Sequence, residues 1–362
     1  MNAAAPYVSF VSYFRNDGYT NDFELRVKRA TGFLARQLQR AGIPAELLLV
    51  EWNPPSDRPL IIDSLGPLPQ DDCVQIRGIV VGEEHHLPFR GADEWGMNPA
   101  AAANVGLRRA RGAFVTPKAA DSYLSAELVG LLAQRSLSDE AMYRCDRVDV
   151  VLSTGDLIQL DDRTLLDKLS SLEGTRHARL PRSSQWHIRD LHTNACGDFL
   201  LMSGTMWRTV RGFPLDGTVL SLDCDSLVMH AAAALGLQET CLPPACRVLK
   251  GIHGHLFSSR VTPVFEPWQA RLDAALTRAR WWRLHSLARS HFNYPRRKIR
   301  GIDNVLGLSF ERNFVTRAEA WAQGEIPELN QPENWGLADQ PLEERLLCRA
   351  SWNSTASDVA AA

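Results

Sequence analysis

The chain has 362 residues, of which 45% are hydrophobic and 23% are charged, and its formal net charge is −2. This is the composition of a soluble globular protein with one large domain or two modest ones; no apolar run reaches the ~18 residues of a membrane span, and the near-neutral charge offers no general attraction to nucleic acid. Seven cysteines without a C-x-x-C pair argue against a disulfide framework and a structural zinc site, so we expect a cytoplasmic location.

Strand and helix patterns alternate along the chain. Apolar runs of strand length occur at residues 7–13, 45–52 and 74–81, and residues 141–153 have a strand pattern in which charged residues alternate with apolar ones. Helical spacing of apolar residues occurs at 22–41, 99–110, 126–134 and 223–237. Gly42 is placed to end the first helix, and Ser125 is placed to cap the third. This alternation predicts an α/β fold with a mostly parallel central sheet flanked by helices.

Two nucleotide-binding motifs are missing, and the charge is unevenly placed. No Gly-rich dinucleotide fingerprint follows the first strand and no P-loop pattern occurs, which argues against an NAD or FAD enzyme. Residues 271–300 hold nine basic residues and one acid, so this segment carries +8 and the remainder of the chain −10. Such asymmetry indicates an anionic partner for the C-terminal part.

Five segments in a fixed order carry a resemblance to a known family. They are VSYFRND (11–17), LLLVEWNPP (47–55), NVGLRRARGAF (104–114), GDFLLMSGTMWRTVRGFP (197–214) and DCDSLVMHAAAALGL (223–237). Together they resemble the GT-A glycosyltransferases, in particular the family-2-like bacterial sugar transferases, over roughly residues 7–260. The resemblance implies a Rossmann-like GT-A fold and the transfer of a sugar from an activated donor.

The resemblance also implies a set of donor-binding residues. These are Arg15, Asn16, Asp17, Glu51, Asn53, Asn104, Arg108, Lys118 and Asp121. The first five follow strands one and two, where such enzymes enclose the base and ribose. An arginine at position 108 suits a diphosphate, because the guanidinium fork matches phosphate oxygens. For each of these residues the alternative is a solvated turn or a helix cap.

The metal-binding acid pair of the family is incomplete. Asp121 matches its second acid, and the first is replaced by alanine. One possibility is a weakly held Mg²⁺ or Mn²⁺, bound by Asp121, the donor phosphates and His253 or His255. The other is that Lys118, helped by Arg108, neutralises the leaving diphosphate without a metal. The departure from the family pattern favours weak or absent metal dependence.

Asp225 matches the acid that, in inverting members of the family, accepts the proton of the acceptor hydroxyl. A carboxylate at the start of a helix is suited to this role. Asp223 is the neighbouring candidate, and the alternative for both acids is that they only complement the helix dipole. The implied acceptor-binding residues are His192, Asn194, Gly197 and Asp198. A structural turn hydrogen bond is the alternative for His192 and Asn194.

The sequence divides into three parts. We expect a GT-A domain at 1–265 (nucleotide half to about 125, acceptor half from 126), a basic helical extension at 266–350 and a disordered tail at 351–362. Within the extension, Trp281 and Trp282 lie among arginines. Either this helix lies on an anionic membrane surface, or its tryptophans pack on the catalytic domain and its arginines are solvated.

The expected function is therefore that of an inverting glycosyltransferase with Asp225 as base. Its partners would be a nucleotide-diphosphate sugar and a glycan or lipid-linked glycan of the bacterial surface, at the inner face of the cell membrane. Two alternatives remain. The chain is a catalytically inactive, glycan-binding or scaffolding relative, which the incomplete acid pair suggests, or it uses a sugar diphosphate without a nucleoside.

Overall fold

The computed structural model describes residues 6–251 with short gaps at 19, 67, 69–72, 173, 180–188 and 222. Beyond these it describes 261–264, 268, 271–272, 275, 296–299 and 316–348. His253, most of the basic segment 271–300 and the tail 351–362 lie outside the described residues, so their predicted roles stay predictions.

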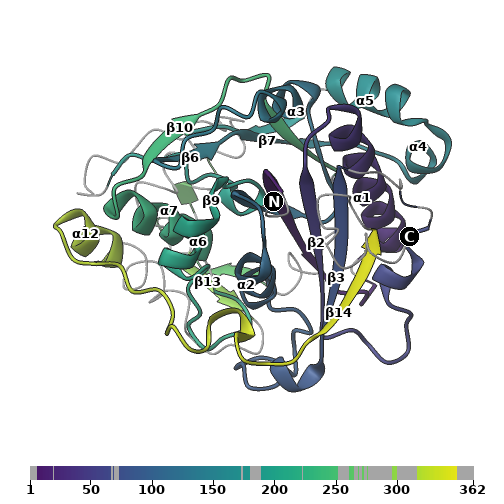
Figure 1. Ribbon diagram of the computed structural model, residues 1–362. Coiled ribbons are helices and arrows are strands. Elements are labelled where there is room, and N and C mark those ends of the chain that lie inside the picture. Colours follow the sequence, from purple (N-terminus) through teal and green to yellow (C-terminus); the bar gives the residue numbers. More distant parts are fainter. Residues whose placement is uncertain are drawn as a thin grey trace, which may run out of the picture.

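A six-stranded sheet forms the centre of the molecule, in the order β14-β3-β2-β1-β4-β9 (Figure 1). Its parallel strands are β1 (Val8–Phe14), β2 (Ala45–Trp52), β3 (Val74–Val81) and β4 (Phe114–Ala119). Its antiparallel edges are β9 (Met202–Ser203) and β14 (Glu343–Cys348). The predicted α/β fold with a mostly parallel central sheet is confirmed.

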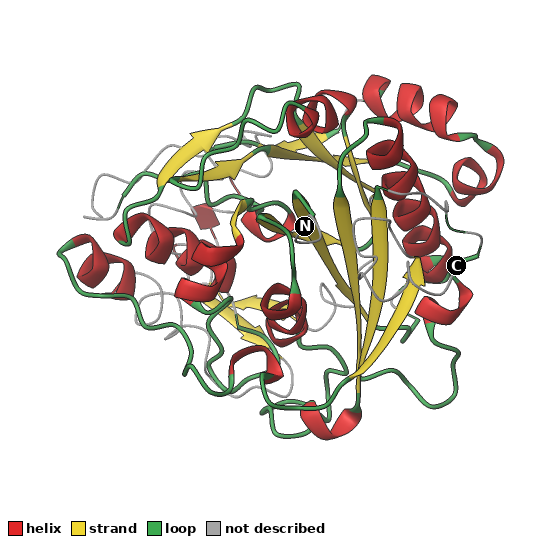
Figure 2. Ribbon diagram, viewed as in Figure 1, coloured by secondary structure: helices red, strands yellow, loops and turns green. Residues whose placement is uncertain are grey.

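Helices cover both faces of this sheet (Figure 2). Alternate residues of β2 point to opposite faces: Leu47 and Leu49 join the core under α1 (Phe23–Arg40), whereas Leu48 and Val50 join the core under α2 (Pro99–Arg109). Helix α2 approaches the sheet closely at Gly106, where a Cβ would lie 2.3 Å from Val11 Cγ1. Burial on both faces explains why β2 is an apolar run and not an alternating one.

Smaller elements extend the central sheet on one side. A second sheet has the order β5-β11-β7-β8, formed by β5 (Ser122–Leu124), β11 (Arg247–Gly251), β7 (Asp146–Val150) and β8 (Thr175–His177). A two-stranded pair joins β6 (Ala141–Arg144) to β10 (Gln238–Cys241). The strand predicted at 141–153 is therefore two strands, β6 and β7, in different sheets. The remaining helices here are α3 (Ala126–Ala133), α4 (Thr154–Gln159), α5 (Asp162–Ser171), α6 (Gly204–Val210) and α7 (Cys224–Ala234).

Two predicted helix ends have the expected local chemistry. The hydroxyl of Ser125 accepts a hydrogen bond from Leu128 N at 3.3 Å at the start of α3. Gly42 follows α1 with a φ of +62°, a left-handed conformation that favours glycine.

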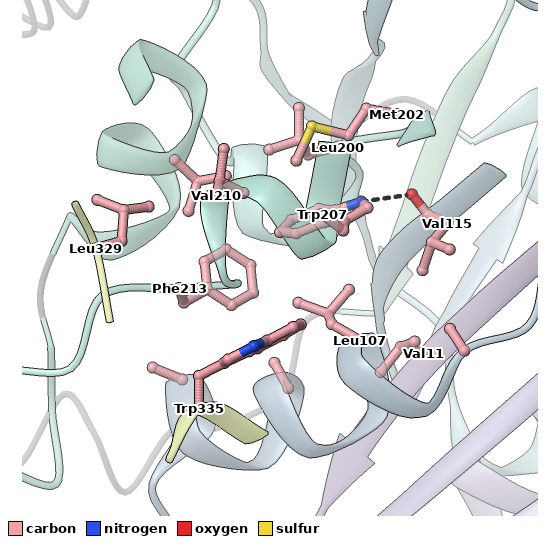
Figure 3. Close-up of a cluster of buried hydrophobic side chains, with 14 of the residues drawn as sticks. Val11, Leu107, Val115, Leu200, Met202, Trp207, Val210, Phe213, Leu329 and Trp335 are labelled. Carbon is pink, nitrogen blue, oxygen red and sulfur yellow. Dashed lines mark hydrogen bonds between the residues drawn. The ribbon is translucent and has the colours of Figure 1, made fainter. Parts of the chain in front are cut away.

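Residues 316–348 of the C-terminal segment contribute to the main core. Helix α12 (Thr316–Ala322) packs against α7, and β14 pairs with β3 at the sheet edge (Figure 1). Trp335 is buried beside Leu107 and Phe213 (Figure 3). We had expected residues 266–350 to be a helical extension; residues 343–348 instead complete the central sheet, so this part is neither separate nor purely helical.

Candidate active site

The direction of winding in the parallel sheet reverses between β1 and β4. Strands β2 and β3 add on one side of β1, and β4 adds on the other. In open α/β sheets such a switch point leaves a ligand-binding crevice at the carboxyl ends of the strands. The side chains gathered there are Tyr13 (β1), Lys118 and Asp121 (end of β4), Asp198 (3₁₀ helix Cys196–Asp198), Asp225 (α7) and Lys250 (β11). Four of these six residues were predicted from the sequence.

The carboxylate of Asp225 is held in one orientation by backbone donors. Its Oδ2 accepts a hydrogen bond from Gly197 N at 2.8 Å, and its Oδ1 accepts one from Ser226 N at 2.8 Å. A Cβ on Gly197 would lie 2.9 Å from Asp225 Oδ2, so this position favours glycine. A carboxylate can accept about four hydrogen bonds, so Asp225 keeps acceptor capacity for a ligand hydroxyl.

Asp223 has a different place at the start of the same helix. It is the residue before the first turn of α7, with a left-handed φ of 56°, and its side chain makes no capping hydrogen bond. The structure therefore places both acids at the helix start, and it orients Asp225 toward the loop that carries Gly197 and Asp198.

A chain of charged groups runs from the crevice into the second sheet. Lys250 Nζ lies 3.5 Å from Asp198 Oδ1, and Asp198 Oδ2 accepts a hydrogen bond from Arg147 Nη1 at 2.5 Å. Arg147 also pairs with Asp149 at 2.8 Å, and Asp149 pairs with His177 at 2.9 Å. The charge of Asp198 is thus already compensated by Arg147.

Lys118 lies behind this chain and is almost fully buried, with 1% of its surface exposed. Its Nζ donates a hydrogen bond to the carbonyl of Ala119 at 2.8 Å. Burial lowers the pKa of Lys118 to about 8, although the nearby carboxylates of Asp121 and Asp198 act to raise it. Such a buried ammonium group contributes to the field of the crevice more than to direct contact.

The described residues fit a divalent cation poorly. Asp121 is the remaining acid of the pair, and it is coupled electrostatically to both Lys118 and Lys250. No group of three or more His, Cys, Asp or Glu side chains suited to a metal occurs within the described part of the chain. A divalent ion beside Asp121 would meet two ammonium groups, whose repulsion is strong in a partly buried site.

Four predicted donor residues lie together after β1 and β2. Arg15 Nε donates to Asn53 O at 2.5 Å, and Arg15 Nη1 lies 3.2 Å from Asp17 Oδ2. Asn53 Nδ2 donates to Gly96 O at 2.9 Å, and Asn16 Nδ2 donates to Pro59 O at 2.9 Å. They form a polar cluster at the same carboxyl edge of the sheet as the crevice.

Glu51 is buried beneath this cluster. Its two oxygens accept hydrogen bonds from Ile61 N at 2.9 Å and Ile62 N at 3.1 Å, at the start of the short helix Ile61–Ser64. Burial raises the pKa of Glu51 to about 7, against the effect of these backbone donors. Glu51 therefore orders the loop after β2, and any contact with a base or ribose would be made by that loop.

Asn104 and Arg108 are not brought to the crevice, which corrects the prediction. Asn104 is fully buried and exchanges two hydrogen bonds with the backbone of Phe213, at 2.8 and 2.6 Å. Arg108 stacks over Trp335, with its Cζ 4.9 Å from the ring centroid. The physical reason is direction: α2 runs antiparallel to β4, so its last turn lies at the amino edge of the strands.

Two of the predicted acceptor residues have structural partners. His192 is buried, with Nε2 2.9 Å from Asp146 Oδ1, and burial lowers its pKa. Asn194 Nδ2 donates to Ala178 O at 3.1 Å. Gly197 and Asp198, by contrast, lie against Asp225 and Lys250.

Sequence reasoning missed Lys250, Arg147 and Tyr13. Lys250 is the first residue of KGIHGHLF, a segment in which the histidines had been the candidates. A lysine directly after the buried residues Val248 and Leu249 of the strand RVLKG was the available signal, because a half-buried lysine usually has a charged partner.

No known family model matches this chain, and no curated protein matches its sequence. Among solved structures, S. aureus TarS 1-349 in complex with UDP-GlcNAc matches at 14% identity and a TM-score of 0.43, over 71% of this chain and 62% of that one. The catalytic domain of Drosophila beta1,4galactosyltransferase 7 in complex with xylobiose matches at 13% identity and a TM-score of 0.34, over 65% and 63%. The matches span less than two thirds of those chains, so the description of the fold rests on the strand order of this chain.

Proposed function

We propose that this protein is a GT-A-type glycosyltransferase that moves a sugar from a nucleotide-diphosphate donor to a hydroxyl group of a glycan acceptor. The observation that carries the proposal is the position of Asp225. It presents an oriented carboxylate at the switch point of a Rossmann-like sheet, hydrogen-bonded to Gly197 N, and the next residue, Asp198, pairs with Lys250. The family resemblance of the five sequence segments supports the same function.

The arrangement suits an inverting, single-displacement reaction. The acceptor hydroxyl gives its proton to Asp225 as its oxygen forms a bond to the anomeric carbon. On the opposite face of the sugar, the bond from that carbon to the diphosphate oxygen breaks, and the diphosphate leaves with the electron pair. The positive groups of the crevice stabilise this developing charge.

In this proposal, different groups of polar residues bind the nucleoside and the diphosphate of the donor. The nucleoside lies against Arg15, Asn16, Asp17 and Asn53. The diphosphate lies near Asp121 and the ammonium groups beside it. The acceptor enters from the loop of Gly197 and Asp198, which is adjacent to the base.

We further infer an acceptor of the bacterial surface, either a glycan or a lipid-linked glycan. No helix within the described part of the chain is long and apolar enough to cross a membrane. The basic segment 271–300 would let the protein lie on an anionic membrane surface at the inner face of the cell membrane. Binding to vesicles with and without anionic lipid tests this part of the proposal.

The reaction itself is tested by incubating the full chain with UDP-, GDP-, dTDP- and CMP-linked sugars and following donor consumption and product anomer by NMR. We expect wild-type protein to transfer sugar with inversion of the anomeric configuration, and we expect Asp225→Asn to lose this transfer. Retention of configuration would contradict the role of Asp225. If neither transfer nor hydrolysis occurs with any donor while glycans still bind, the scaffolding alternative replaces this proposal.

A further inference from the structure

We propose that Lys250 is the resident cation of the crevice, with its ammonium group holding the donor diphosphate in place of a divalent metal ion. The inference rests on the glycosyltransferase function proposed above. It adds a phosphate-binding residue that neither the family pattern nor the sequence pointed to.

The position of Lys250 is fixed by strand pairing. β11 runs antiparallel to β5, and Lys250 is the cross-strand partner of Ser122, the residue directly after Asp121. Its ammonium group is also 3.5 Å from Asp198 Oδ1. Lys250 therefore lies between the remaining acid of the metal-binding pair and a second carboxylate, which is where a bound cation would be stabilised.

Lys250 is the accessible one of the two lysines. Its side chain is 21% exposed, whereas Lys118 is 1% exposed and directs its Nζ to Ala119 O. Because an ammonium group must reach a phosphate oxygen to hold it, Lys250 is the group that touches the donor. Lys118 adds positive potential from behind.

Lys250 is also free to change partners. Its distance from Asp198 is longer than a hydrogen bond, and an ammonium group has three donors. Since Arg147 donates directly to Asp198, movement of Lys250 toward a phosphate does not leave that carboxylate without a counter-charge.

The test measures binding of UDP, GDP, dTDP and CDP, and of the matching monophosphates, by calorimetry in EDTA and in Mn²⁺. We expect one diphosphate to bind equally well in both. In Lys250→Met its affinity should fall about tenfold or more, since charge-assisted hydrogen bonds are the strong ones, while the monophosphate changes less. Lys250→Arg should keep most of the affinity. Lys168 lies on α5 and pairs with Asp156 of α4, and Lys168→Met should keep all of the affinity.

A folding defect is separated from lost binding by a second variant. Lys250→Met leaves Asp198 with Arg147 as its remaining partner, whereas Asp198→Asn/Lys250→Met removes both members of the Lys250–Asp198 pair, and it should fold and still bind the diphosphate weakly. Binding that requires Mn²⁺, or equal binding by Lys250→Met, overturns the inference and leaves the transferase function standing. If no nucleoside diphosphate binds in either buffer, the nucleotide donor itself is wrong, and the inference fails with it.

Discussion

Charged side chains are buried at both edges of the parallel strands, and the two edges use them differently. At the amino edge, Glu46 accepts from Ser9 Oγ at 2.6 Å, Arg77 Nε at 2.9 Å and Arg111 N at 2.8 Å. Arg77 in turn donates to Glu344 of β14 and to Arg109 O, at 2.9 and 2.7 Å. This network fastens the C-terminal strand to the sheet.

At the carboxyl edge, the charged side chains do not form a comparable network of close ion pairs. Lys118 donates to a backbone carbonyl, Lys250 Nζ lies 3.5 Å from Asp198 Oδ1, and Asp225 is held by backbone donors. Buried ionic groups that are fully satisfied stabilise or specify a fold, whereas groups left with spare capacity in a crevice are candidates for function. The comparison therefore supports the proposed placement of the reaction at the carboxyl edge, whereas the network at the amino edge attaches the C-terminal strand to the sheet.

The largest expected effect is on activity at the carboxyl edge. Asp225→Asn should lower kcat by about 10²- to 10⁴-fold, because it removes the proton acceptor while keeping the shape of the side chain. Asn can accept only one of the two backbone hydrogen bonds that Asp225 accepts, so the melting temperature should fall by a few degrees while the protein stays folded. Asp161→Asn alters another acid at a helix start, on α5, and should retain full activity. A low kcat in Asp161→Asn would show that removing an acid at a helix start lowers activity by destabilising the fold, and not by removing the proton acceptor.

At the amino edge the expected effect is on stability. Glu46→Ala should lower the free energy of unfolding in urea by ~3–5 kcal/mol, because it leaves Arg77 buried without its main partner. Glu344 also pairs with Arg77, but its side chain is 39% exposed. Glu344→Ala should therefore lower the free energy of unfolding by less than ~1 kcal/mol. The folded fraction of both variants should transfer sugar at the wild-type rate. A loss of specific activity in Glu46→Ala would break the division between the edges.

The buried ammonium of Lys118 predicts a pH-dependent cost at the carboxyl edge. Its pKa is about 8 in the folded chain against an ordinary 10.5, so the unfolded chain binds more protons between these values and stability rises with pH. Lys118→Met should be more stable than wild type at pH 7, by on the order of 3 kcal/mol, and the difference should shrink as pH rises from about 8 to 10.5. Unfolding curves from pH 7 to 10.5 measure it, with Lys168→Met as the control. A constant difference would contradict the assignment.

The smallest effect concerns the orientation of the base. Gly197→Ala would place a Cβ 2.9 Å from Asp225 Oδ2 and push the carboxylate aside. We expect kcat to fall about tenfold with little change in donor affinity, since misplacement of a catalytic group costs rate more than binding. Gly155→Ala, where the nearest neighbour is 3.7 Å away, is the matched control. Wild-type kcat in Gly197→Ala would mean that Asp225 does not need this alignment.

The sequence predicted the parts of the molecule that local patterns determine. The strands β1, β2 and β3 and the helices α1, α2, α3 and α7 follow from apolar spacing, and Asp121, Asp198 and Asp225 follow from motif order. Arg108 was misplaced because closeness to Lys118 in sequence does not show that an antiparallel helix carries it to the other edge. Lys250 and β14 were missed because each acquires its role from a partner far away in the chain, Asp198 for one and β3 for the other.

The most direct test of the central claim is hydrogen exchange of the backbone amides with and without nucleoside diphosphate. A ligand at the carboxyl edge should slow exchange in residues 118–125 and 196–198. Residues 108–112 and 343–348, at the amino edge and in β14, should exchange as before. Protection confined to 108–112, or no protection by any diphosphate at saturating concentration, would contradict the assignment of this edge as the site of sugar transfer.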